Sequence, residues 1–93
     1  MRNDPKITEA IAHEAARFIL REAGTGSMIT VIRAERLHNH HIAVFVSVFP
    51  EDKTKAALAF LERHREDFSD HLKSHVRMGP LPRVDFMLDN TPR

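Results

Sequence analysis

Histidine is the residue type in this chain that is best suited to chemistry, with seven copies among 93 residues. His71 and His75 are four residues apart, so on a helix both imidazoles would project from the same side. Two imidazoles so placed can share a metal ion if a third ligand, such as Asp67, completes the set. A second group lies in a short polar stretch: His38, His40 and His41. Because solvated histidines are the more common case, we expect no metal at either group, although the second could contact RNA when protonated.

Basic side chains gather between residues 71 and 83, a segment that contains no acidic residue. Cations on one accessible face bind phosphates because each contact releases condensed counterions. The spacing predicts that Lys73 and Arg77 share one side of a helix, and that Arg17 and Arg21 share a side of another. The simpler interpretation is that such cations only offset a helix dipole. The candidate RNA-binding residues are Arg17, Arg21, Arg33, Arg36, Lys73, His75, Arg77 and Arg83.

Carboxylates and serines are the remaining candidates for catalysis, and neither group has a catalytic setting. Asp85 and Asp89 would both lie on the outward face of a strand, where solvent keeps a carboxyl group ordinary. The serines lack the context of a nucleophile, and no glycine-rich phosphate loop is present. A chain of this length also has little room for a concave pocket. We therefore expect that the protein is not an enzyme and needs no cofactor.

Length and composition limit the other classes. We expect one domain over residues 1–93, with an ordered core at about residues 5–89. The net charge of +1 is lower than most nucleic-acid-binding proteins show. The absence of cysteine excludes disulfides, and no apolar run approaches the roughly 18 residues that span a membrane. The first residues also lack the apolar stretch of a signal peptide. These features favour a cytoplasmic protein that is a monomer when free.

Hydrophobic periodicity predicts the elements that position these residues. An apolar stripe from Ile7 to Ala23 predicts a helix that begins after the capping pair Asp4-Pro5 and ends near Gly24. Two segments with a strand pattern follow, Met28–Leu37 and Ile42–Phe49. The tight polar turn His38-Asn39-His40 should join them as an antiparallel hairpin, with Asn39 in the left-handed conformation.

Two further helices and a last strand complete the predicted order. Asp52 is the expected cap of the second helix, and a third helix should extend to Arg77. Alternation from Val84 to Leu88 predicts a strand with one buried face. Most phenylalanines fall on buried stripes, so we expect no exposed aromatic side chains for base stacking. The predicted fold class is α+β, in the order α-β-β-α-α-β, with a three-stranded sheet and three helices on one face.

Two segments take the interpretation further. The first is the hairpin, Ile29–Glu35 followed by Ile42–Val48; the second is Leu81–Asp89, where a hydrophobic-Pro step leads into an apolar-x-Phe-apolar-Leu-Asp pattern. Together, at this separation, they resemble the ribosome-binding factor A family, whose fold is a type-II KH-like domain. The resemblance extends from about Pro5 to Asp89.

Local departures from that family are specific. The family bends between its second and third helices at a small residue, x, then glycine, whereas this chain has His64-Arg65-Glu66. The connection from residue 24 to residue 27 is shorter than in the family. The Gly-x-x-Gly motif with which a conventional KH domain grips the backbone of a nucleic acid is missing between these helices. We therefore expect recognition of folded RNA by shape and charge.

The resemblance implies a ribosome assembly factor that binds the immature small ribosomal subunit and assists late maturation of its rRNA. Its partners would be that subunit and its rRNA, with no membrane and no small-molecule substrate. The alternative that the residues leave open is an α+β protein-interaction domain without RNA binding. The alternative predicts an exposed apolar patch on the sheet around Phe45 and Phe49.

Overall fold

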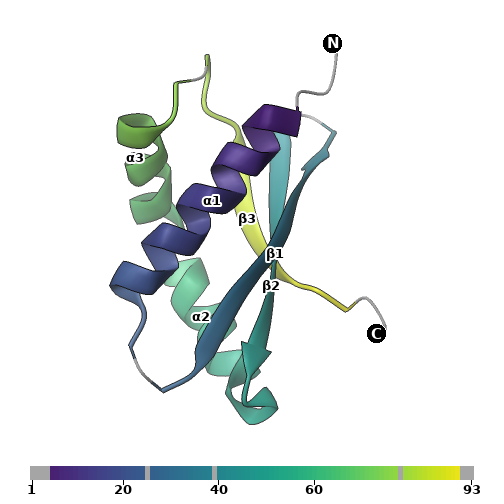
Figure 1. The fold of residues 1–93 in the computed structure, drawn as a ribbon, viewed down its shortest axis with the longest axis vertical. Coiled ribbons are helices and arrows are strands. Elements are labelled where there is room, and N and C mark those ends of the chain that lie inside the picture. Colours follow the sequence, from purple (N-terminus) through teal and green to yellow (C-terminus); the bar gives the residue numbers. More distant parts are fainter. Residues whose placement is uncertain (1–4, 25, 39, 78, 91–93) are drawn as a thin grey trace.

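The computed structural model describes residues 5–24, 26–38, 40–77 and 79–90. The elements are α1 (Pro5–Glu22), β1 (Met28–Leu37), β2 (His41–Phe49), the short 3-10 helix η1 (Glu51–Lys53), α2 (Thr54–Arg63), α3 (Arg65–His75) and β3 (Arg83–Leu88) (Figure 1). The predicted order and the α+β class are thereby confirmed. Asp4 and Asn39, to which the sequence assigned a cap and a turn conformation, lie outside the described residues, and His40 has a positive φ of 58°.

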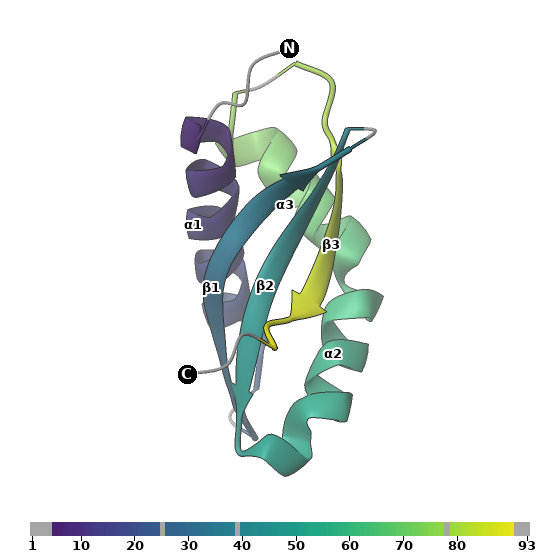
Figure 2. The same cartoon turned by 90° about the vertical axis from the view of Figure 1, so that its right-hand side faces the viewer.

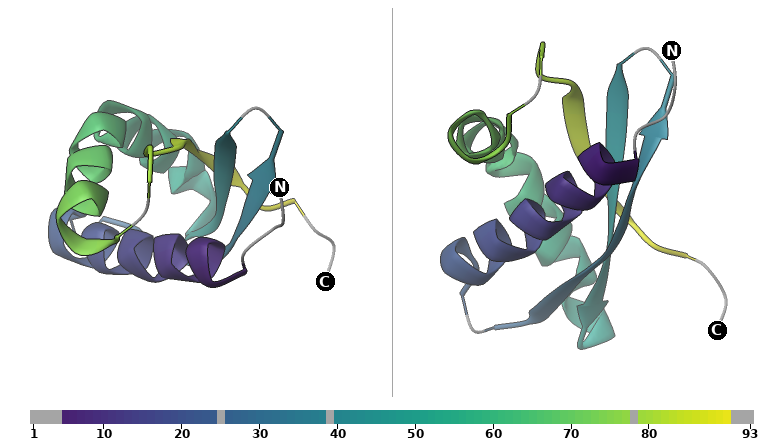
Figure 3. Two further views of the ribbon diagram at one scale, coloured as in Figure 1. Left: turned by 90° about the horizontal axis from the view of Figure 1, so that it is seen from above. Right: turned by 45° about the horizontal axis from the view of Figure 1, so that its top comes forward.

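The sheet is mixed, with β2 in the centre. β1 pairs with β2 in antiparallel fashion, and β2 pairs with β3 in parallel. A parallel pair requires a crossover, which α2 and α3 supply between β2 and β3. The helices lie on one side of the β1–β2 hairpin (Figures 2 and 3). The other face of the sheet, which we call the open face, carries no helix from the described residues.

The core lies between the helices and the face of the sheet that they cover. In β2, alternate residues Ile42, Val44 and Val46 are fully buried and point to the helices. They pack against buried side chains of the helices, most of which follow one another at three or four residues along α1 and α3. These side chains are Ile11, Ala15, Phe18 and Ile19 of α1, Leu61 of α2, and Phe68 and Leu72 of α3. Burial of a large apolar side chain of this kind stabilises the fold by about 1.5–3 kcal/mol. The inward side chains of β2 and the apolar stripes of the helices therefore pack together as one core.

Two predicted helix boundaries were wrong. Asp52 does not cap α2, because residues 51–53 form η1 and α2 begins at Thr54, whose hydroxyl donates to the carbonyl oxygen of Glu51 at 2.7 Å. α3 ends at His75, and Val76 is extended at φ −129° and ψ 127°. Arg77 therefore does not share a helix face with Lys73. The chain has to leave α3 here because it must cross to Arg83, the first residue of β3.

α2 and α3 bend at the single residue His64, without a glycine. His64 has φ −101° and ψ 12°, which an ordinary residue can adopt. Its backbone N–H still donates to the carbonyl oxygens of Phe60 and Leu61, at 3.1 and 3.2 Å. Its ring contacts Asp67, with 3.0 Å between Nδ1 and Oδ2. No described helix is both long and apolar enough to cross a membrane.

Candidate functional site

Five of the predicted RNA-binding residues lie at one end of the molecule, which we call the basic end: Arg36, Lys73, His75, Arg77 and Arg83. The described residues between α3 and β3, which are residues 76, 77 and 79–82, lie at this end (Figure 1). The backbone N–H of Arg83 donates to the carbonyl oxygen of His40 at 3.1 Å, and Nε2 of His40 lies 2.9 Å from the carbonyl oxygen of Pro80. The hairpin turn is thus tied to the crossing segment.

A shallow hollow of about 320 Å³ opens at the end of α3, and none of the described residues that line it carries a carboxylate. Its walls are Lys73, Ser74, His75, Val76 and Arg77. Nζ of Lys73 lies 3.7 Å from Asp70, and both side chains are highly exposed, so that pair is weak. Arg77 has no ion pair within the part of the chain that the structure describes. Phosphate oxygens in this hollow would meet no carboxylate from its described walls.

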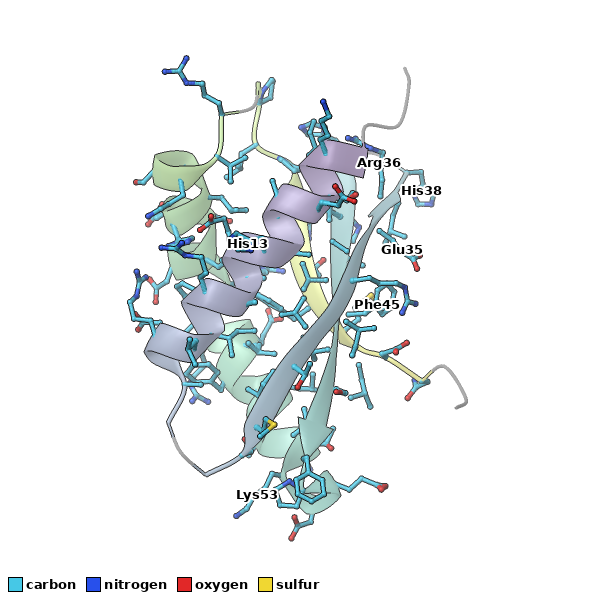
Figure 4. The ribbon with its side chains drawn as sticks, in the orientation of Figure 1. His13, Glu35, Arg36, His38, Phe45 and Lys53 are labelled. Carbon is cyan, nitrogen blue, oxygen red and sulfur yellow. The ribbon has the colours of Figure 1, made fainter. Side chains whose placement is uncertain are left out.

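Arg36 and Arg83 lie at the same end of the sheet but on opposite faces. The register pairs Arg36 with the core residue Ile42, whereas Arg83 pairs with His41. Nε of Arg36 is buried and has no hydrogen-bond partner among the described residues. Figure 4 shows Arg36 and His38 at the end of the molecule where α1 begins, with Lys53 at the far end. Both arginines therefore border the basic end, one from each face.

Arg17 and Arg21 are not brought to the basic end. They lie on the exposed side of α1 and are accompanied by acids: Nε of Arg17 is 3.9 Å from Glu14, and Nε of Arg21 is 3.0 Å from Glu22. The neighbouring hollow between α1 and α3, of about 340 Å³, also has three carboxylates in its walls. These are Glu22, Asp67 and Asp70. Phosphate would meet a mixed surface there.

Arg33 lies on the open face and its charge is already matched. The guanidinium sits over the ring of Phe45, 4.4 Å from its centre. It also donates to Glu35 and, over 3.1 Å, to Asp89. The hydrogen bonds to Glu35 and Asp89 raise the pKa of Arg33 above its ordinary value. Figure 4 shows Phe45 and Glu35 on the side of the sheet away from the helices.

Asp85 is not the ordinary surface carboxyl that the sequence predicted. Its side chain is 20% exposed and accepts from Arg65 at 2.6 Å and from Arg83 at 3.1 Å. Its Oδ2 atom also lies 2.6 Å from Nε2 of His41. Burial raises the pKa of Asp85, but the hydrogen bonds from these basic groups outweigh it and lower that pKa overall. The carboxylate thereby joins the start of α3 to the sheet.

The expectation of solvated histidines was wrong for His71, which is only 7% exposed. Its Nε2 lies 2.8 Å from Oε1 of Glu14 on α1, and its ring stacks on that of His75 at 4.0 Å between centres. The hydrogen bond with His71 lowers the pKa of Glu14, against the effect of burial. Asp67, the expected third ligand, contacts His64 instead. Glu14 could have been noticed because it lies three residues after Ile11, within the apolar stripe of α1.

An apolar patch lies at the other end of the sheet. Leu20, Met28 and Phe49 are 86%, 65% and 72% exposed. They border a hollow of about 420 Å³ with Ile19 and Ile29. The expectation that exposed aromatic rings are missing was therefore wrong for Phe49, the last residue of β2.

Comparison with solved structures decides the fold. The crystal structure of ribosome-binding factor A from Thermus thermophilus superimposes with a TM-score of 0.76. The match covers 94% of this chain and 97% of that chain, at 23% sequence identity. The chain has the fold of ribosome-binding factor A. The type-II KH-like arrangement predicted from the two sequence segments is thus confirmed. No protein-family model and no curated protein sequence matches the chain.

Proposed function

We propose that this protein is a ribosome assembly factor that binds the immature small ribosomal subunit and assists late maturation of its rRNA. The observation that carries the proposal is the similarity to ribosome-binding factor A, which extends over almost the full length of both chains. The proposal includes a single KH-like domain at about residues 5–89 that acts in the cytoplasm and is a monomer when free.

The basic end is the proposed contact with rRNA. Lys73, His75 and Arg77 line a hollow whose described walls hold no carboxylate. Arg36 and Arg83 lie at the same end of the molecule, on the two faces of the sheet. Contacts of this kind go to phosphates and depend on shape and charge, which suits folded RNA and needs no Gly-x-x-Gly loop. Arg17 and Arg21 would contribute less because they lie away from this end of the molecule. Arg33 and Arg83 would contribute less than Arg77 because carboxylates already bind their guanidinium groups.

The factor would act without catalysis. Glu14 and Asp85, whose pKa values are lowered, each bind basic side chains that link separate elements. Such pairs perturb a pKa for structural reasons. The Glu14 pair joins α1 to α3 and the Asp85 pair joins α3 to the sheet, and together they fix the positions of the elements that form the proposed RNA-binding end.

Co-sedimentation with immature small subunits at increasing salt tests the proposal. Lys73→Ala and Arg77→Ala should each weaken binding and reduce the slope of log affinity against log salt by about one. Lys53→Ala is the matched control, because this exposed cation lies at the opposite end of the molecule (Figure 4). Binding that does not depend on salt, or an equal loss in Lys53→Ala, would contradict the basic end as the contact.

A second candidate function, a protein-interaction domain without RNA binding, is favoured by the exposed apolar patch of Leu20, Met28 and Phe49. A contiguous exposed apolar patch commonly marks a surface that binds another protein. This function predicts that Leu20→Ser and Phe49→Ser abolish binding to the particle while Arg77→Ala leaves it intact. The reverse result would favour the assembly factor that contacts rRNA.

A further inference from the structure

We propose that Glu14, His71 and His75 form a binding site for a divalent transition-metal ion, of which Zn²⁺ is the probe of choice. One potential ligand atom from each residue lies within 4.8 Å of the other two. Two imidazoles and one carboxylate form a three-ligand set that zinc accepts, with a water molecule in the fourth position. This inference does not depend on the proposed function.

The distances are close to those that the ion needs. Zinc bonds of about 2.0–2.2 Å place tetrahedral ligand atoms roughly 3.3–3.6 Å apart. Oε1 of Glu14 and Nε2 of His71 are 2.8 Å apart, so these two atoms need to separate only slightly to admit an ion. His71 and His75 occupy consecutive turns of α3, and their rings are stacked at 15°. Stacked rings point their nitrogens in nearly parallel directions, so one imidazole must rotate about its side-chain torsions before both rings can face one ion.

The hydrogen bond of His75 prepares this side chain to be a ligand. Nδ1 of His75 lies 2.8 Å from the carbonyl oxygen of His71. A carbonyl oxygen can only accept, so Nδ1 carries the proton and Nε2 carries the free lone pair. Metal-bound histidines usually donate their other N–H to a carbonyl or carboxylate, which fixes the ring and the tautomer. Binding of the ion to Nε2 of His71 requires the tautomer that carries its proton on Nδ1; a neutral ring therefore moves its proton from Nε2 to Nδ1, and only an imidazolium would release one to solvent.

The charges around the site favour a cation over a phosphate. The hollow into which His71 and His75 open is lined by Glu22, Asp67 and Asp70 and by one guanidinium, that of Arg21. Arg17, 3.9 Å from Glu14, opposes a cation, and Glu14 itself adds a further negative charge. The balance in this hollow is negative, whereas Lys73 and Arg77 border His75 on its other side. A bound ion would join α1 to α3 through ligands that are 57 residues apart in sequence.

Titration of the full chain with Zn²⁺ alone tests the site. Isothermal titration calorimetry should detect one ion per chain, and long-range ¹H–¹⁵N spectra should show shifts of the ring nitrogens of His71 and His75. His75→Gln is the main variant, because His75 is exposed and its loss leaves the core intact. Loss of a partner that only supports a ligand lowers metal affinity about 10–100-fold. Loss of the ligand itself should therefore lower affinity at least tenfold.

Two further variants complete the experiment. Glu14→Gln keeps the shape of the side chain and an oxygen for His71, and it should also weaken Zn²⁺ binding at least tenfold. His38→Gln, which removes an exposed histidine of the hairpin turn, should leave the affinity unchanged. If the ring signals of His71 and His75 do not move, or if His75→Gln binds Zn²⁺ as tightly as the unaltered chain, Glu14 and His71 form an ion pair only and the inference is wrong.

Discussion

Replacing Asp85 with asparagine should lower the stability of the fold by about 2 kcal/mol at neutral pH. Its 20% exposed carboxylate accepts from Arg65 and lies 2.6 Å from Nε2 of His41. A hydrogen bond to a charged group contributes about 1.5–3 kcal/mol. The third partner, Arg83, is 65% exposed and adds little. Asparagine keeps one acceptor oxygen, so part of the interaction survives. For a domain of this size the melting temperature should fall by about 8–16 °C.

The effect should depend on pH in a defined direction. Although burial alone would raise the pKa of Asp85, the hydrogen bonds from Arg65, Arg83 and His41 lower it in the folded chain. In the unfolded chain the carboxyl titrates near about 3.9. Between these two pKa values the unfolded state binds more protons, so stability falls as the pH falls. The contribution of the charge should be complete above about pH 5 and should fade as the pH drops through the folded pKa.

Urea denaturation of both proteins, followed by circular dichroism in steps from pH 7 to pH 3.5, measures this difference. Asp70→Asn is the matched control, because the side chain of Asp70 is 77% exposed and its pair with Lys73 is long, at 3.7 Å. That control should stay within about 0.5 kcal/mol of the unaltered protein. The reasoning is refuted if Asp85→Asn is as stable as the unaltered protein at pH 7, or if the difference does not shrink below about pH 4.

Three further substitutions test the core, the bend and the apolar patch. Phe68→Ala removes a fully buried ring that contacts Phe18 and Phe86, and urea denaturation should show a loss of about 3–5 kcal/mol. His64→Gly should lower the free energy of unfolding by about 1 kcal/mol in the same assay, because it removes the contacts with Phe60 and Asp67 and gives the unfolded chain more backbone entropy. Equal or greater stability would mean that the bend needs glycine. Leu20→Gln should change the free energy of unfolding by less than about 0.5 kcal/mol in thermal melts, and a larger loss would show that Leu20 is not exposed in solution.

The junction between α2 and α3 shows that two helices can meet at a bend without a glycine between them. The family that the sequence resembles has a glycine at this bend and this chain does not, yet the bend forms at His64. His64 stays at negative φ, so the bend does not require the conformational freedom of glycine. The chain also tightens the junction, since the N–H of His64 contacts two carbonyl groups and its ring contacts Phe60 at 4.5 Å between centres.

The order of elements and their buried faces were predictable from the sequence alone. Periods of two and of three to four residues are local properties of the chain, and they identified β2 and the stripes of α1 and α3 with almost their observed bounds. The boundaries that failed, at Asp52 and Arg77, lie where the chain turns toward another element. Such positions depend on where the next element packs, and the local pattern does not contain that information.

The surroundings of the charged side chains were decided only by the tertiary structure. Residue types pointed to cations and histidines, but Glu14 meets His71 across 57 positions of sequence, and Asp85 meets His41 across 44. The fold likewise separates Arg17 and Arg21 from the basic end and places Glu14 and Glu22 beside them. Ionic contacts act over a few ångströms in space, whatever the separation along the chain. The sequence therefore determined which groups are available for chemistry, and the packing of α1 and α3 against the sheet determined which of them meet.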